Sequence, residues 1–79
     1  MPYVLPKISE LIRDLFDDFQ GPITRHLTAG DVPQWDSLGH IQLIVGLERA
    51  FNVRFTAAEV RRYVDLGDLI DAVEKKLAG

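Results

Sequence analysis

The chain has 79 residues, a formal net charge of −3 at pH 7 from twelve acidic and nine basic side chains, and no cysteine. Without cysteine, neither disulfides nor a thiolate metal site can stabilise it, so a hydrophobic core must do so, and the apolar fraction of 47% is sufficient for one. The acidic balance argues against nucleic acid as the main partner. We expect one small monomeric domain over residues 1–79. No apolar stretch is long enough to span a bilayer, and no secretion signal opens the chain, so we also expect an unprocessed cytoplasmic protein.

The first amphipathic pattern covers residues 6–19. Pro6 suits the first position of a helix, and the Gln20-Gly21-Pro22 stretch suits its end. Between them, apolar side chains recur every three or four residues and form one stripe, which predicts a helix with a single buried face. The members of this stripe are Ile8, Leu11, Ile12, Leu15, Phe16 and Phe19.

Residues 21–35 carry proline near both ends and no sustained period. A connection this long is either functional or packed by its own side chains. We expect Ile23, Leu27 and Val32 to anchor it in the core, with one short helical turn. An ordered loop of this length brings the chain back to the end where it began, so the two long helices that it joins should be antiparallel.

The second long helix should begin at Ser37 and end near Phe51. Asp36 is a suitable N-cap, because its carboxylate can accept from free N–H groups of the first turn and its charge opposes the helix dipole. The Ser37 hydroxyl would then lie at the positive end of the helix, where a phosphate ester is favoured. Asp and Ser are also common at helix starts that have no such function, so this alternative stays open.

Placing the residues of this helix at about 100° intervals separates two apolar stripes. The broader one is assigned to the core and consists of Leu43, Ile44, Leu47 and Phe51. The narrower one consists of Leu38, Ile41 and Val45, and the neighbouring helices either cover it or leave it as a docking surface. Gly39 and Gly46 each cost about 1 kcal/mol in a helix interior, which indicates close approach by another segment.

A third, short helix follows from the capping box of Thr56 and Glu59, with Phe55 and Val60 at hydrophobic-staple positions. It should pack the side chains of Val60, Tyr63 and Val64. Asp65 then caps a last helix whose apolar positions are Leu66, Leu69, Ile70, Val73 and Leu77. These patterns predict an all-α fold, a small bundle of three longer helices and one short third helix.

The run from Val32 to Glu48 resembles the phosphopantetheine attachment region of acyl carrier proteins. Its Asp36-Ser37-Leu38 core becomes specific together with the preceding loop, the Leu-Ile-x-x-Leu-Glu continuation and the helix exit at residues 51–53. The order of the helices and the long first loop extend the resemblance over nearly the whole chain. It implies a non-catalytic carrier, on which a transferase esterifies the serine with 4'-phosphopantetheine from coenzyme A and acyl groups hang as thioesters.

Carried over by this resemblance, Ser37 is the attachment site, and Asp36 supports the magnesium-dependent modifying enzyme while it caps the helix. The positions implied for partner binding are Leu38, Ile41, Gln42, Val45, Glu48 and Arg49. The positions implied for an acyl pocket are His40, Leu43, Leu47 and Tyr63. The implied partners are a phosphopantetheinyl transferase, an acyl- or aminoacyl-loading ligase or transferase, and downstream synthase enzymes. His26 has no companions for a metal site.

The sequence departs from carriers of bacterial fatty acid biosynthesis, which are far more acidic along the second helix. Here that surface holds Gly39, Gln42 and Arg49, and Arg54, Arg61 and Arg62 lie nearby in the sequence. These arginines either select other partners or form an ordinary solvated surface. The sequence of residues 35–40 is more similar to that of stand-alone carriers of specialised pathways such as polyketide biosynthesis. An aminoacyl or peptidyl carrier of a nonribosomal-peptide-like system is the alternative.

Three other classes of protein are weighed against a carrier. An enzyme is disfavoured, because the chain has no Gly-x-Ser-x-Gly elbow and its two histidines lie far apart in sequence. A helix-turn-helix DNA-binding protein is disfavoured, because no basic stripe continues beyond residues 51–64. An unmodified helical interaction bundle would show the same core and the same exposed stripe, and only modification of Ser37 separates it from a carrier.

Overall fold

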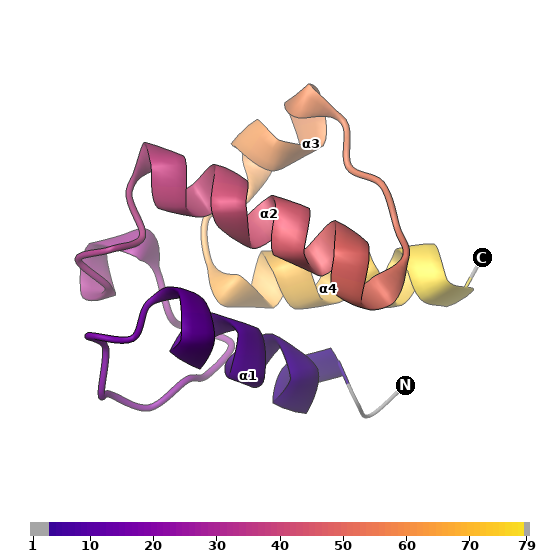
Figure 1. Cartoon of the computed structure of the whole chain (residues 1–79). Helices are drawn as coiled ribbons and strands as arrows, with labels where there is room; N and C mark the ends of the chain where they lie inside the picture. Colours follow the sequence, from indigo (N-terminus) through magenta and orange to yellow (C-terminus); the bar gives the residue numbers. More distant parts are fainter. Residues whose placement is uncertain (1–3, 79) are drawn as a thin grey trace.

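The computed structural model describes residues 4–78 and contains four α-helices (Figure 1). In chain order the elements are α1 (Val4–Leu15), the 3-10 turn η1 (Ala29–Asp31), α2 (Ser37–Phe51), α3 (Ala57–Arg62) and α4 (Leu66–Ala78). The predicted all-α class is confirmed, with three longer helices, a short third one and a helical turn in the first loop. Over the described residues, none of these helices combines the length and the apolar character that crossing a membrane requires.

The three longer helices pack against one another, and the short α3 has no buried residue. Figure 1 shows α1 and α2 running in opposite directions, as predicted, with α4 behind α2 and the short α3 above both. The packed pairs are α1 with α2, α1 with α4, and α2 with α4. The core is therefore enclosed by three helices and closed at one end by the long loop.

The core contains the apolar stripes predicted for all three helices. Its buried side chains are Val4, Ile8, Ile12, Phe16, Leu27, Val32, Trp35, Leu43, Ile44, Leu47, Leu66, Leu69, Ile70 and Val73. Two of the predicted loop anchors, Leu27 and Val32, are fully part of it, while Ile23 and Phe51 pack against it partly buried. The loop is thus a structural part of the domain.

The loop is fixed by hydrogen bonds to the start of α4. The backbone N–H of Leu66 donates to the Leu27 carbonyl, and that of Gly67 donates to the Arg25 carbonyl, both at 2.8 Å. The first N–H groups of a helix have no partner inside it, so the loop carbonyls satisfy two that would otherwise need water. Asp65 also caps this helix as predicted, because its Oδ1 accepts from the N–H of Asp68 at 2.9 Å.

The predicted bounds of the first helix were wrong at both ends. It begins at Val4, which leaves Pro6 within the first turn, where its missing N–H costs nothing. It ends at Leu15 instead of Phe19, because Arg13 stabilises a turn there: its guanidinium donates to the carbonyls of Phe19 (2.9 Å) and Gly21 (2.8 Å). The same guanidinium lies 5.7 Å from the centroid of the Phe19 ring, which is held partly buried against the core.

Two residues expected to pack are exposed instead. Val64 is 74% exposed, because α3 has already ended and the N–H of Val64 donates to Asp68 Oδ2 at 2.8 Å, which fixes the link with the Val64 side chain outward. Leu77 is 47% exposed. It lies in the last turn of α4, and the end of this helix extends beyond the end of α2 in Figure 1.

Candidate functional site

The candidate site is the first turn of α2. Asp36 is its N-cap, as predicted, and its Oδ1 accepts from the N–H of Gly39 at 2.8 Å. The Asp36 carbonyl accepts the first intrahelical bond, from His40, at 2.8 Å. Ser37 is therefore the first residue of a 15-residue helix, and its side chain is exposed. The remaining first-turn N–H groups and the helix dipole favour an anion beside its hydroxyl.

A buried aromatic stack supports this turn from below. The Trp35 ring stacks on Phe16 and on His40, with centroid distances of 6.1 Å in both cases. The Trp35 backbone N–H donates to the Val32 carbonyl at 2.9 Å. Trp35 itself is 4% exposed, so the residue immediately before the cap is fixed in the core while Ser37 points to solvent.

His40 connects this stack to α3. The indole N–H of Trp35 donates to His40 Nδ1 at 3.0 Å, and His40 Nε2 lies 3.1 Å from the carbonyl oxygen of Val60. Because an indole nitrogen can only donate, Nδ1 is the acceptor and the ring proton sits on Nε2, where it bonds the carbonyl. The side chain is partly buried. Sequence reasoning placed His40 near the core but missed this link, because Val60 is 20 residues away.

The second apolar stripe of α2 is uncovered by the rest of the domain. Leu38 is 65% exposed, Ile41 55% and Val45 41%, so the alternative in which neighbouring helices cover Ile41 was wrong. Gln42 and Arg49 are exposed beside it. Glu48 is different, because its carboxylate accepts from the N–H of Phe55 at 2.9 Å and holds the link between α2 and α3. We call Leu38, Ile41 and Val45 the docking stripe.

Comparison with known proteins identifies the family. No protein-family model and no curated protein matches the chain. Among solved structures, the chain is similar to the solution NMR structure of the holo acyl carrier protein from Geobacter metallireducens, with 39% sequence identity and a TM-score of 0.86. The match covers 96% of this chain and 87% of that one. The chain belongs to the acyl carrier protein family.

A shallow groove opens beside Ser37 in this acyl carrier protein. It has a volume of about 240 Å³ and lies between the end of α1 and the start of α2. Its lining residues are Leu15, Phe16, Gln34, Asp36, Leu38, Gly39 and Gln42. Apolar side chains therefore border the exposed turn on the α1 side, next to the capping carboxylate.

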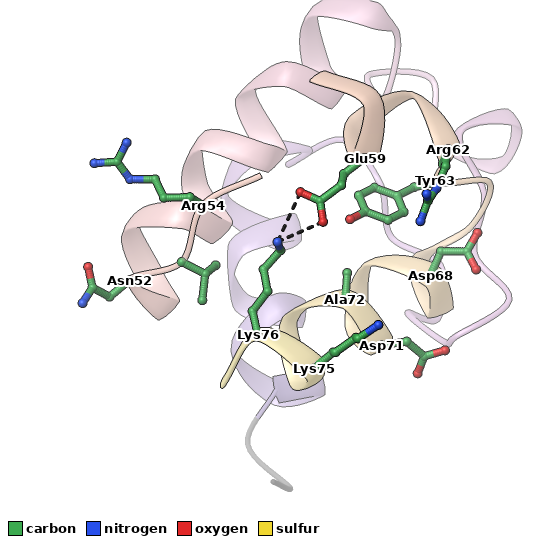
Figure 2. Close-up of a pocket in the computed structure, with 11 residues that line it drawn as sticks. Asn52, Arg54, Glu59, Arg62, Tyr63, Asp68, Asp71, Ala72, Lys75 and Lys76 are labelled. Carbon is green, nitrogen blue, oxygen red and sulfur yellow. Dashed lines mark hydrogen bonds and ion pairs between the residues drawn. The ribbon is translucent and has the colours of Figure 1, made fainter. Parts of the chain in front are cut away.

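The four residues implied for an acyl pocket do not share one cavity among the described residues. Leu43 and Leu47 are completely buried in the core, and His40 is occupied by its two hydrogen bonds. Tyr63 lines a separate opening of about 710 Å³ between α3, α4 and the link after α2 (Figure 2). Over residues 4–78, no opening therefore reaches the buried face of α2.

Charged groups face each other across this second opening. Lys76 lies 3.0 Å from a carboxylate oxygen of Glu59, as Figure 2 shows, and 5.0 Å from the centroid of Phe55. The Thr56 backbone N–H, and then Lys76, hold the pKa of Glu59 below its ordinary value. Tyr63 packs edge-on against Phe55 at 5.9 Å, and burial raises the pKa of its phenol. The contacts of Lys76 attach α3 to α4, and the Phe55–Tyr63 pair joins the two ends of the segment that contains α3.

Proposed function

We propose that this acyl carrier protein bears 4'-phosphopantetheine on Ser37 and presents acyl intermediates to partner enzymes. The observation that carries the proposal is the exposed Ser37 hydroxyl on the first turn of a 15-residue helix, beside a capping aspartate. The solved relative is described as a holo acyl carrier protein, which supports the same modification here. When bound, the arm supplies a terminal thiol that holds the cargo as a thioester.

The residues present fit such a group. The first-turn N–H groups and the positive end of the helix dipole stabilise a phosphate on the Ser37 oxygen. The fixed Trp35 and the cap of Asp36 display that oxygen in one position. One carboxylate oxygen of Asp36 accepts from the N–H of Gly39, and the exposed carboxylate would support the magnesium-dependent modifying enzyme. The groove beside Ser37 borders the turn where the arm begins.

The partner-binding residues of the proposal are the docking stripe with Gln42 and Arg49. The exposed side chains form a narrow apolar strip with a polar border, which is the composition of a small recognition surface. Glu48 contributes indirectly in this proposal, because its bond to Phe55 sets where α3 begins. The modifying transferase and the loading and synthase enzymes would all use this strip, since all must reach Ser37.

The cargo pocket of the proposal lies behind His40. Leu43 and Leu47 would line its apolar interior and Tyr63 its far side. Opening it requires α3 to move away from α2, and the bond from His40 to the Val60 carbonyl opposes that movement. Because α3 has no buried residue, it is the helix that moves at the lowest cost.

We assign the carrier to a specialised pathway, with polyketide-type acyl cargo favoured over aminoacyl cargo. Arg49 and Gln42 are exposed on the helix that the partners bind. Carriers of fatty acid biosynthesis are acidic on the corresponding surface. Opposite charges steer association and like charges repel, so a partner selected for an anionic helix should bind this one poorly.

The deciding experiment is the intact mass after incubation with coenzyme A, magnesium and a broad-specificity phosphopantetheinyl transferase. We expect the wild type to gain one phosphopantetheine and Ser37→Ala to gain none. Ser9→Ala is the matched control, because Ser9 is the chain's other serine, and it should be modified like the wild type. Thermal unfolding should place Ser37→Ala within about 0.5 kcal/mol of the wild type, because an exposed hydroxyl contributes little to the core.

Three outcomes would contradict the proposed function. If folded wild type gains no mass with two different transferases, the chain is an unmodified helical interaction bundle. If Ser37→Ala is modified, the attachment site is elsewhere. If Ser37→Ala loses most of its helical signal, the residue has a structural role that its exposure does not predict.

A further inference from the structure

Exposed charged side chains lie at both ends of α2, the helix that carries Ser37. At the Ser37 end there are three exposed carboxylates: Asp36 caps α2, and Asp17 and Asp18 follow α1. Gln34 holds the segment after α1 close to the start of α2, because its side chain accepts from the Asp18 backbone N–H at 3.0 Å and donates to Asp17 Oδ1 at 3.4 Å. The end of α1 is therefore part of the same surface.

The opposite end is basic. Two exposed arginines, Arg49 and Arg54, lie in the last turn of α2 and in the link that follows it. Arg61 and Arg62 are also exposed, but they follow Val60, whose carbonyl contacts His40, so they lie nearer the Ser37 end; Figure 2 shows Arg54 and Arg62 on opposite sides of the opening. Within residues 4–78 the ion pairs are Arg25 with Asp71 and Lys76 with Glu59, so neither Arg49 nor Arg54 has a carboxylate partner there. We call Arg49 and Arg54 the arginine end.

The carboxylates of this region are directed inward. Glu48 accepts from the Phe55 N–H, and Glu59 accepts from the Thr56 N–H while it pairs with Lys76. Figure 2 shows Glu59 and Lys76 facing each other, whereas the Arg54 guanidinium points away from that opening. The positive side chains thus reach solvent, and the negative ones nearby are used within the fold.

The arginine end continues the docking stripe. Arg49 follows Val45 by four residues, which places the two side chains on one face of α2. With a rise of 1.5 Å per residue, Arg49 lies about 18 Å from Ser37 along the helix axis. A partner that acts at Ser37 and rests on the docking stripe therefore meets positive charge about 18 Å from its reacting group.

We propose that the proteins which dock on α2 present a narrow apolar strip with a cluster of carboxylates about 18 Å from the group that acts at Ser37. This rests on the proposed function, and it specifies the partner. Opposite charges steer association and like charges repel, so carboxylates at that distance favour the orientation that brings the partner's reacting group to Ser37, and a basic rim there opposes it.

The test uses one phosphopantetheinyl transferase in two forms. The first form has lysines and arginines around its carrier-docking surface, and in the second these are replaced by glutamates. For each carrier, kcat/KM for Ser37 modification is measured with both forms at low salt. The value for the glutamate form is then divided by the value for the basic form. Any intrinsic damage to the glutamate form cancels when this ratio is compared between carriers.

Three carriers are compared: wild type, Arg49→Glu/Arg54→Glu, and the matched control Lys7→Glu/Lys75→Glu. The control makes the same change in net charge at exposed positions on α1 and α4. We expect the ratio for the wild type to exceed that for the arginine variant about tenfold and to fall toward it in about 0.5 M salt, because salt screens charges at the surface. The lysine variant should stay within about twofold of the wild type, because charge away from the docking face steers less.

Two results would overturn the docking proposal while leaving the carrier function intact. One is a ratio that is the same for the wild type and the arginine variant. The other is an equal change in the lysine variant, which would show that net charge and not this surface matters. If neither form of the transferase modifies the wild type, both this proposal and the proposed function fail.

Discussion

Gly39 and Gly46 show how much a single position depends on what faces it. Both lie inside α2, and the sequence predicts close approach at both, because glycine is unfavourable in a helix. At Gly39 an added Cβ would overlap the carbonyl oxygen of Gln34, which belongs to the backbone, and would lie 3.0 Å from the Phe16 ring. At Gly46 the nearest atoms are those of the Leu11 side chain, whose two methyl groups lie at 2.9 Å. The sequence could not separate the two cases, because the path of the loop decides them.

Alanine at these two glycines should therefore have different effects. We expect Gly39→Ala to lower the free energy of unfolding by about 2 kcal/mol, because the backbone of Gln34 must move to make room. Gly46→Ala should stay within about 1 kcal/mol of the wild type, since the gain in helix propensity offsets the shift of a flexible leucine. Urea denaturation of the two variants measures both values. Equal losses would mean that the loop before α2 is more compliant than its hydrogen bonds indicate.

At the scale of elements, α3 is attached differently from the other helices. It has no buried residue, and two side chains from the longer helices hold it: His40 bonds the Val60 carbonyl, and Lys76 pairs with Glu59. Tyr63 and Phe55, which flank α3, pack against each other. The sequence predicted the start of α3 correctly, because the capping box of Thr56 and Glu59 is local. It could not predict the bonds to His40 and Lys76, since these partners are brought together only by the fold.

Acid should loosen α3 through Glu59. The pKa of Glu59 in the folded protein is below its ordinary value of 4.5, first because of the Thr56 N–H and then because of Lys76. The ionised carboxylate therefore stabilises the fold fully above that ordinary value, and its contribution is lost as the pH falls through the lowered pKa. We expect the Thr56 amide resonance to titrate in this acidic range.

Two glutamine variants serve as controls for this titration. In Glu59→Gln the Thr56 amide should no longer titrate, because no proton binds at that position. In Glu10→Gln, on the exposed face of α1, it should titrate as in the wild type. A midpoint above 4.5 in the wild type would show that Glu59 is not held in its ionised form by these partners.

Packing in the whole domain buries one side of α2 and leaves the other side exposed. The angular spacing of the α2 residues predicts this division. Leu43, Ile44 and Leu47 are in the core, whereas Leu38 and Val45 are exposed, so both stripes lie where the spacing places them. What spacing could not supply is the reason that the exposed side stays open. That depends on the paths of α3 and of the link after it, neither of which covers these side chains.

The same substitution on the two sides of α2 tests this division. Leu47 is completely buried and Leu38 is 65% exposed, so Leu→Ala removes the same atoms from opposite environments. We expect Leu47→Ala to lose about 2–5 kcal/mol, because it leaves a cavity among the three longer helices. For a domain of this size, such a loss lowers the melting temperature by roughly 10 °C or more.

Leu38→Ala should change the unfolding free energy by about 0.5 kcal/mol or less. It should instead slow the modification of Ser37, since it shortens the docking stripe. Thermal melts and transferase kinetics on both variants measure this, and a large loss of stability in Leu38→Ala would place that side chain in a packed interface rather than on an open surface.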